Sequence, residues 1–270
     1  MLTAYELDRF LEEDLGEDDD SNGIVPEVKA FGKIICKEDG ILAGAQEACQ
    51  VFGHLGLKTK KLIDDGSKVK KGDVLIEVGG NAADMLRGER LSLNILGRMS
   101  GIATLTAECV SLAGDVRIAA TRKTTPGLRK LEKKAVKLGG GDTHRYDLSS
   151  AVMIKDNHIA IMGIERAISE AKMVASFTKK IEIEVESLED AEKAAKLGAD
   201  IIMFDNMAPD VIKEGVMRVN KINPKVITEA SGGITIHNLA DYSKTGVDVI
   251  SLGALTRDAK WLDISMDITI

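Results

Sequence analysis

The chain has 270 residues, of which 44% are hydrophobic and 29% are charged, and its formal net charge is −7. This composition is that of a globular protein with one large or two ordinary domains. The acidic balance disfavours nonspecific binding to nucleic acid or anionic membranes, and the 3% of aromatic residues argues against surfaces that stack bases or sugars.

The cysteines and the N-terminal segment indicate where the protein works. Cys36, Cys49 and Cys109 are widely spaced and form no CxxC pair, which is typical of reduced thiols. The acidic N-terminus lacks the apolar stretch of a signal peptide, and no apolar run is long enough to cross a bilayer. We therefore expect a cytoplasmic protein.

The first 20 residues combine a helical pattern with an acidic run. Leu7 and Leu11 share one face of an expected amphipathic helix over residues 3–15. Three aspartates follow at Asp18, Asp19 and Asp20. No loop with a fixed glycine surrounds them, so we expect a solvated acidic loop rather than a metal site.

From residue 28 to residue 78 the pattern is strand-like and punctuated by glycines, for example at 33–36 and 60–63. The segment 65–79 resembles the hairpin of biotinyl or lipoyl carrier domains. It has no Met-Lys pair at a hairpin tip, so it predicts a β-hairpin and argues against a carrier function.

A long helical pattern covers residues 82–113 and contains Arg87, Arg90 and Arg98. Its apolar residues are spaced for burial on one side. Gly97 and the Ser100-Gly101 pair are expected to break or kink this helix.

After this helix, short strand and helix patterns alternate along the chain. Short apolar segments predict strands at 118–120, 151–154, 181–185, 201–204, 226–228 and 249–252, and helical patterns lie at 131–138, 161–174, 188–197, 209–220 and 236–244. This alternation predicts a parallel sheet, and about six such units fit a βα barrel or partial barrel. A doubly wound open sheet is the alternative, but no GxGxxG motif follows the first strand.

In a βα barrel, functional groups follow the carboxyl ends of the strands. Every predicted strand has polar or glycine residues at its end or directly after it. In chain order they are Thr121 to Thr124, Lys155 to His158, Glu182 with Glu184, Asp205 with Asn206, Glu229 to Gly233, and Gly253 with Ala254.

Residues 117–155 hold ten basic and three acidic side chains in an otherwise acidic chain. Four of the lysines, Lys130, Lys133, Lys134 and Lys137, recur at helical spacing and are expected to form a solvated helix face. Four others gather near strand ends together with a histidine: Arg122, Lys123, Arg145 and Lys155, with His144. Arginine binds carboxylates and phosphates in a bidentate way, so this cluster predicts a polyanionic ligand.

Two further sets complete the predicted site. Ser231, Gly232, Gly233, Gly253 and Ala254 place backbone N–H groups at the last two strand-to-helix turns, where phosphate can bind. Glu184 and Asp205 follow adjacent strands and can hold Mg²⁺ or ribose hydroxyls; the alternative for them is ion pairing with nearby lysines.

At these residues the chain resembles a known family. The segments 121–127 (TRKTTPG), 139–145 (GGGDTHR), 154–158 (IKDNH), 182–186 (EIEVE) and 231–233 (SGG) are similar to motifs of quinolinate phosphoribosyltransferases. The similarity continues at 89–94, 100–103 and 262–266, so it spans nearly the whole chain in the right order.

The resemblance implies an α/β fold with an N-terminal α/β sandwich at 1–100, an open, TIM-like βα barrel of about six to seven strands at 101–256, and a C-terminal tail at 257–270 that returns to the first domain. It implies a decarboxylating pentosyl transfer from phosphoribosyl pyrophosphate to quinolinate, with Mg²⁺, in de novo NAD biosynthesis. The products are nicotinate mononucleotide, pyrophosphate and CO₂. It also implies a homodimer, or a hexamer built from dimers, in which Arg90 enters the partner's active site.

Carried over to this chain, the resemblance places Arg122, Lys123, His144, Arg145 and Lys155 around quinolinate, together with Arg90 of a second copy. Glu184 and Asp205 hold the ribose and Mg²⁺, directly or through water, and with Lys155 form the catalytic set. The glycine turns hold the 5′-phosphate. One departure is Thr143, where many members have Asn, and it predicts altered local contacts.

Three alternatives remain open at this point. The first is a nicotinate phosphoribosyltransferase, which does not decarboxylate its substrate. The second is a Schiff-base aldolase that uses Lys155. The third is a non-catalytic relative associated with molybdenum transport, which would be expected to diverge around 124–126 and 155–158, where this chain keeps the motifs.

Overall fold

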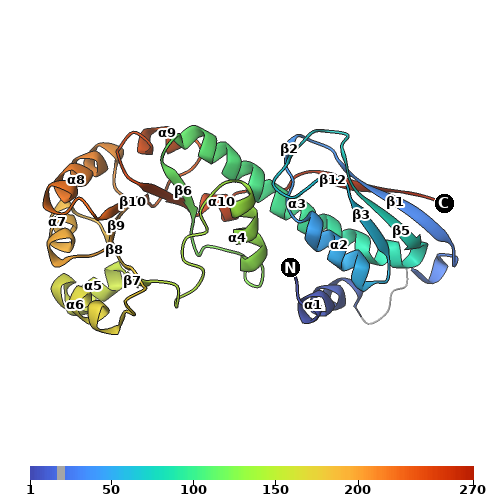
Figure 1. The fold of residues 1–270 in the computed structure, drawn as a ribbon, viewed down its shortest axis with the longest axis horizontal. Coiled ribbons are helices and arrows are strands. Elements are labelled where there is room, and N and C mark those ends of the chain that lie inside the picture. The colour runs from blue at the N-terminus through green and yellow to red at the C-terminus, as the bar shows by residue number, and fades with distance from the viewer. Residues whose placement is uncertain (17–21) are drawn as a thin grey trace. The chain divides into compact units, whose positions relative to one another are not determined.

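The computed structural model describes residues 1–16 and 22–270, so the aspartates at 18–20 lie outside the described residues. The chain divides into two compact units (Figure 1). The first contains residues 1–107, 130–139 and 259–270, and the second contains 108–129 and 140–258.

The first unit is built on a four-stranded antiparallel sheet in the order β12-β1-β5-β3. Its strands are β1 (Lys29–Cys36), β3 (Lys58–Lys61), β5 (Val74–Asn81) and β12 (Ile264–Thr269). The C-terminal strand β12 pairs with β1, so the end of the chain completes the N-terminal sheet. Alternate residues of β1, including Ile34 and Cys36, are buried against the helices, as the two-residue period of a strand requires.

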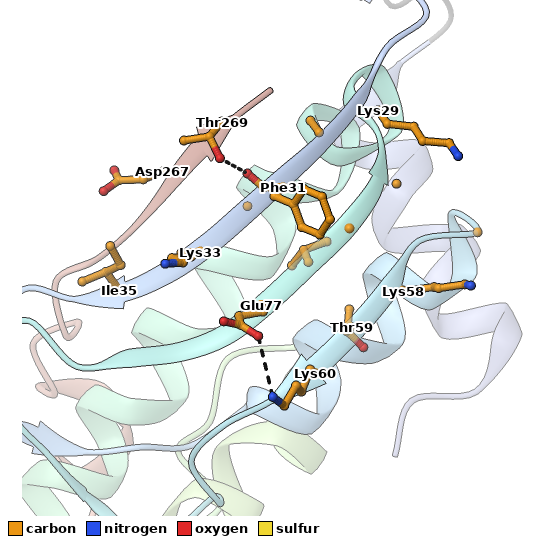
Figure 2. A pocket seen from close by; sticks show the side chains of 16 residues that line it. Lys29, Phe31, Lys33, Ile35, Lys58, Thr59, Lys60, Glu77, Asp267 and Thr269 are labelled. Carbon is orange, nitrogen blue, oxygen red and sulfur yellow. Dashed lines mark hydrogen bonds and ion pairs between the residues drawn. The ribbon is translucent and has the colours of Figure 1, made fainter.

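The opposite face of this sheet is open (Figure 2). A shallow hollow of about 780 Å³ runs across it and is lined by Lys29, Lys33, Lys58 and Lys60 among others. Phe31 stands on this face and is 70% exposed. None of the residues that the sequence places in the active site belongs to this hollow.

The helices α1 (Ala4–Leu15) and α2 (Ala45–His54) belong to the same unit. The predicted helix at 3–15 is confirmed, and it begins with a capping box in which Thr3 and Glu6 bond reciprocally. The strand-like interpretation of 28–78 is wrong at α2. There Ala45, Ala48 and Phe52 recur at helical spacing and are buried.

The predicted β-hairpin at 65–79 is also wrong. β4 (Lys68–Val69) pairs with β2 (Gly40–Ile41), whereas β5 pairs with β1 and β3. β4 and β5, the two strands of the expected hairpin, therefore belong to different sheets. The short 3-10 helix η1 (Asn22–Ile24) precedes the sheet.

The long helix α3 (Ala82–Ala113) runs unbroken for 32 residues, so the expected break is wrong. Its glycines serve close packing instead. A Cβ at Gly101 would lie 2.0 Å from the Lys260 carbonyl oxygen, and one at Gly97 would lie 3.1 Å from the Leu262 carbonyl oxygen. Glycine is needed there because the returning chain passes directly over the helix.

The helix α4 (Arg129–Leu138) corrects the expectation of a fully solvated lysine face, since Lys133 is only 1% exposed. Lys134 donates to the buried carboxylate of Glu47 at 2.8 Å. Lys130 reaches Glu6 at 2.9 Å. Lys130 and Lys134 therefore connect α4 to other parts of the first unit.

The second unit is an open barrel of parallel strands with helices outside them (Figure 1). The strands are β6 (Arg117–Ala120), β7 (Val152–Ile154), β8 (Ile181–Val185), β9 (Ile201–Asp205), β10 (Ile227–Ser231) and β11 (Val249–Leu252). Their order is β6-β11-β10-β9-β8-β7, and every neighbouring pair is parallel. The predicted open βα barrel is therefore confirmed.

The helices of this unit are α5 (Asp156–Met162), α6 (Ile164–Val174), α7 (Leu188–Leu197), α8 (Pro209–Ile222), α9 (Leu239–Tyr242) and α10 (Ala254–Arg257). The single helix expected at 161–174 is instead two helices divided at Gly163, whose φ is 78°. The helix expected at 236–244 is one turn, Leu239–Tyr242. No helix among the described residues is both long and apolar enough to cross a membrane.

The open edge of the barrel carries a short extra segment. After α4 the chain returns beside β6, where the Asp142 N–H donates to the Ile118 carbonyl and the Ala120 N–H donates to the Asp142 carbonyl, at 2.8 and 2.9 Å. Ala119 and Asp142 form an isolated parallel bridge. The residues that follow Asp142 are thereby held at the edge of the barrel.

Candidate active site

A cavity of about 330 Å³ lies at the carboxyl ends of the barrel strands. It brings together most of the residues that sequence patterns single out: Arg122, Lys123, His144, Arg145, Lys155, Glu184, Asp205 and Ser231. Each comes from a strand end or from the segment beside β6, because parallel strands direct their carboxyl ends to one side of the barrel.

The remaining predicted residues have other positions. Arg90 lies on α3 in the first unit, is exposed, and is not among the residues that line this cavity. Gly232, Gly233, Gly253 and Ala254 are not among the residues that line the cavity and follow directly after β10 and β11.

Lys155 follows β7 and forms an ion pair with Glu184 on β8. Its Nζ lies 2.5 Å from Glu184 Oε1. The backbone N–H of Lys155 donates to the ring of His158 at 3.0 Å, which fixes the start of α5. The cavity therefore contains an ammonium held directly against one of its two carboxylates.

Asp205 ends β9, and the next residue makes an unusual turn. Asn206 has φ of 54°, its N–H donates to the Ser231 carbonyl at 2.9 Å, and its amide donates to Asp205 Oδ2 at 2.8 Å. A Cβ at Gly232, whose φ is 89°, would lie 2.4 Å from Asn206 Oδ1. Glycine at 232 is thus required for the β9 and β10 turns to meet.

The turn after β6 fixes the position of Lys123. The Lys123 N–H donates to Thr121 Oγ1 at 3.1 Å, and Thr256 Oγ1 donates to the Lys123 carbonyl at 2.7 Å. A Cβ at Gly253 would lie 2.9 Å from Lys123 Cδ, so the bare glycine leaves room for that side chain. Sequence patterns gave no indication of Thr256, because its role depends on a residue 133 positions away.

Arg122 gives the clearest indication that the cavity binds an anion. Its Nε is buried and has no hydrogen-bond partner among the described residues. A buried guanidinium N–H without an acceptor is costly, and carboxylates and phosphates are the acceptors whose geometry it matches.

His144 adopts a left-handed conformation with φ of 52°, and its N–H donates to Asp142 Oδ1 at 2.7 Å. Its ring Nε2 lies 3.2 Å from Glu229 and 3.5 Å from Glu182, two carboxylates inside the barrel. Both are almost fully buried, at 2% and 1% exposure. Sequence patterns placed these glutamates at strand ends but did not indicate that they hold His144.

The charges around His144 favour the protonated form of its ring. Burial disfavours a charged imidazole, but the hydrogen bonds and charges of Glu182 and Glu229 outweigh it and raise the pKa of His144 to about 10. Burial also raises the pKa of Glu182. The Arg145 N–H donates to His144 Nδ1 at 2.7 Å, so Nε2 is the ring nitrogen that faces the two carboxylates.

Arg145 is half-buried in the same cavity as Arg122. Desolvation and the nearby Arg122 charge lower the pKa of Arg145, while Glu182, Glu184 and Glu229 act in the opposite direction. The buried carboxylates thus offset part of the cost of placing two guanidinium groups at one cavity.

Two carboxylates in the cavity are suited to binding a hard cation. Glu184 and Asp205 line this cavity and also an adjoining one of about 350 Å³, which Asp156 and Asp190 share. Carboxylate oxygens are the ligands that Mg²⁺ prefers. Lys155 contacts only one oxygen of Glu184, so the second oxygen and the Asp205 carboxylate are donors that could hold a magnesium ion.

Comparison with known proteins gives one consistent result. The profile of the quinolinate phosphoribosyl transferase C-terminal domain matches residues 102–267, and that of the N-terminal domain matches residues 19–100. A Methanocaldococcus jannaschii protein, named probable nicotinate-nucleotide pyrophosphorylase (carboxylating), is 47% identical over 99% of each chain.

Two further comparisons agree with this result. The carboxylating nicotinate-nucleotide pyrophosphorylase of Rattus norvegicus is 42% identical over 85% of this chain and 79% of its own. The solved structure of the nicotinate-nucleotide pyrophosphorylase from Francisella tularensis superposes with a TM-score of 0.92 at 33% identity, covering 100% of this chain and 98% of that one.

Proposed function

The chain belongs to the quinolinate phosphoribosyl transferase family, and on that premise we propose how its cavity performs the reaction of this family. The protein is a carboxylating phosphoribosyltransferase of NAD biosynthesis. It converts quinolinate and phosphoribosyl pyrophosphate into nicotinate mononucleotide, pyrophosphate and CO₂. The roles of individual residues below are our proposals.

Arg122, Arg145 and Lys155 bind the two carboxylates of quinolinate, with His144 behind them. The observation that carries this assignment is the buried Nε of Arg122, which has no hydrogen-bond partner in the part of the chain that the structure describes and lies near Arg145. Two guanidinium groups held together repel one another, and a dianion between them removes that repulsion and supplies the missing acceptor.

Glu184 and Asp205 face the ribose ring, and Lys123 with the turns at Ser231 to Gly233 and at Gly253 to Ala254 binds the phosphates. The pyridine nitrogen forms a bond to C1 of the ribose while the bond from C1 to the pyrophosphate oxygen breaks. Positive charge develops on the ribose in this step, and the two carboxylates stabilise it. Lys155 lies beside Glu184 and neutralises it in the resting site.

Decarboxylation follows from the new charge on the ring. Once the nitrogen carries the ribose, the ring is cationic, and the bond from C2 to its carboxylate breaks with release of CO₂. The electron pair stays on C2, where the adjacent charged nitrogen stabilises it until a proton arrives. The protein binds the remaining carboxylate and shields the ring, and no covalent intermediate with the enzyme is needed.

Magnesium fits this site as the cofactor. Glu184 and Asp205 would hold the ion, directly or through water, and it would supply positive charge to the departing pyrophosphate. We further propose that the enzyme acts in the cytoplasm, since its substrates are metabolites and its cysteines are free.

The active unit is a homodimer in which Arg90 of one subunit enters the cavity of the other. Arg90 is exposed on α3, and its side chain has no hydrogen bond or ion pair with the residues that the structure describes. An exposed, unpaired guanidinium is available to a substrate carboxylate bound by a second copy. A hexamer built from such dimers would keep the same exchange.

The Schiff-base alternative is disfavoured by the position of Lys155. An amine that attacks a carbonyl must be free to approach it, whereas Nζ of Lys155 is engaged by Glu184 Oε1 at 2.5 Å. Incubation with carbonyl substrates and borohydride should therefore leave the mass of the protein unchanged.

The direct test supplies quinolinate labelled in its 2-carboxylate together with phosphoribosyl pyrophosphate and Mg²⁺. We expect nicotinate mononucleotide, pyrophosphate and labelled CO₂ in equal amounts. Nicotinate replaces quinolinate in a parallel reaction, and faster use of nicotinate without CO₂ release would contradict the proposal.

A further inference from the structure

Two buried carboxylates lie beneath the substrate cavity. Glu182 on β8 and Glu229 on β10 each stand two residues before a residue that lines the cavity, Glu184 and Ser231 respectively. Alternate residues of a strand point to the same side, so this pair forms a layer inside the barrel below the site. Glu182 and Glu229 line another cavity of about 410 Å³, which shares His144 and Arg145 with the substrate cavity.

These two carboxylates have few partners of their own. Apart from the His144 ring, whose Nε2 lies 3.5 Å from Glu182 Oε1, neither oxygen of Glu182 has a hydrogen-bond partner among the described residues, and Glu229 Oε1 has none. The described contact that both share is the ring of His144. Two buried acids converging on one imidazole are more than the stability of a barrel requires, because apolar residues of similar volume fill such layers at lower cost.

The segment that carries His144 is fixed at two points. Asp142 is paired with β6 through the backbone, and the His144 ring is held by Glu229 at 3.2 Å. Between these points His144 takes a φ of 52°, which a non-glycine residue adopts only when its surroundings enforce it. The ring contact is the attachment that can enforce this turn from inside the barrel.

The next residue is Arg145, and its main chain depends on this attachment. The Arg145 N–H donates to His144 Nδ1 at 2.7 Å, so the ring position sets the point from which the Arg145 side chain leaves the backbone. The charges of Glu182 and Glu229 also oppose the repulsion that Arg145 experiences from Arg122. The two glutamates therefore act on Arg145 both through the ring and through their charge.

We propose that Glu229 and Glu182 are positioning residues of the quinolinate site, which hold the His144 ring and thereby aim Arg145 at the substrate carboxylates. The inference rests on the proposed function and deepens it. It predicts a selective effect: loss of the anchor weakens the quinolinate end of the cavity and spares the phosphoribosyl pyrophosphate end, where Lys123 and the turns at 231–233 and 253–254 have their own supports.

The test compares steady-state constants for Glu229→Ala, Glu229→Gln and the wild-type enzyme. Glu229→Ala should raise KM for quinolinate by about 10- to 100-fold, the range for loss of a hydrogen bond to a charged group. KM for phosphoribosyl pyrophosphate should stay at the wild-type value. Glu229→Gln should recover most of the loss, because its amide oxygen still accepts from Nε2–H.

A matched control separates positioning from stability. Thr228 precedes Glu229 on β10, is 1% exposed, and donates to Asp248 at 2.9 Å on the other side of the strand. Thr228→Val should lower the melting temperature without changing KM for quinolinate. The proposal would be overturned if Glu229→Ala raised KM for quinolinate and KM for phosphoribosyl pyrophosphate by the same factor. It would also be overturned if Thr228→Val raised KM for quinolinate as much as Glu229→Ala does.

A second variant covers the case in which Glu229→Ala does not fold. Glu229→Met keeps the buried volume but accepts no hydrogen bond, so it should show the same selective rise. An unchanged KM for quinolinate in folded Glu229→Met would also overturn the proposal. If the wild-type enzyme itself forms no nicotinate mononucleotide, the proposed function fails instead, and the two failures are thereby distinguished.

Discussion

Replacement of Lys155 by alanine tests the role of its ammonium group in substrate binding. In the structure its ammonium lies 2.5 Å from Glu184 Oε1, and the Glu184 side chain is only 15% exposed. Removing the cation leaves that carboxylate unpaired and removes one partner of a substrate carboxylate. Bound substrate covers Lys155, and loss of one partner of a charge pair buried in such a complex typically costs about 2–5 kcal/mol, which corresponds to roughly 30- to 4000-fold in kcat/KM.

Stability should change much less than activity. The Lys155 side chain is 42% exposed, so water already screens the ion pair, and exposed pairs contribute about 0–1 kcal/mol to folding. Chemical denaturation should therefore show nearly the same free energy of unfolding for Lys155→Ala as for the wild type.

The assay measures pyrophosphate release at saturating Mg²⁺ over a range of quinolinate concentrations. Lys213→Ala is the control, since Lys213 is exposed on α8 and lines no cavity described here. Turnover close to wild type in Lys155→Ala would refute the role of this lysine. A similar loss in Lys213→Ala would show that the assay reports overall charge rather than the site.

Three further predictions concern glycine packing and pH. Gly232→Ala should raise KM for phosphoribosyl pyrophosphate and lower stability by about 1–3 kcal/mol, because the new Cβ would lie 2.4 Å from Asn206 Oδ1 at a φ of 89°; an unchanged melting temperature would contradict the strained turn. Gly101→Ala should destabilise the protein even more, because its Cβ would lie 2.0 Å from the Lys260 carbonyl oxygen, while Gly23→Ala, which meets nothing within 4 Å, should not. The pKa of His144, raised in the folded state to about 10, lies above the value near 6.5 expected in the unfolded chain. Its stabilising contribution is therefore complete below about pH 6.5 and is lost as the pH rises toward about 10. Denaturation of the wild type and of His144→Gln at pH 6, 8 and 10 should show the two free energies of unfolding converging, and a constant difference would contradict the pKa.

The barrel was predictable because each βα unit can be recognised from residues close together in the sequence. The strand from Ile201 and the helix from Pro209, for example, are marked by a short apolar run, a proline and helical spacing within about twenty residues. Cations and acids at strand ends then converge because all six strands are parallel. Ion pairing with a nearby lysine was the alternative predicted for Glu184, and the structure shows that pair with Lys155.

The errors arise where a residue's role depends on a distant partner. Gly97 and Gly101 look like helix breakers in isolation, but the backbone at 260–262 packs against them and keeps the helix whole. Lys133 fits a solvated helical stripe, yet it is buried.

The connection of Glu229 to His144 could not be read from the sequence for the same reason. The two residues are 85 positions apart, and a glutamate near a strand end gives no sign of whether it faces ligand or core. The short helix α2 was missed because the glycines around it made the whole segment look like strands and turns.

The decisive measurement is the product balance of the wild-type enzyme with quinolinate labelled in its 2-carboxylate. We expect one labelled CO₂ and one pyrophosphate for each nicotinate mononucleotide formed. Pyrophosphate release with the label retained in the nucleotide, or no nucleotide at all, would contradict the proposed function.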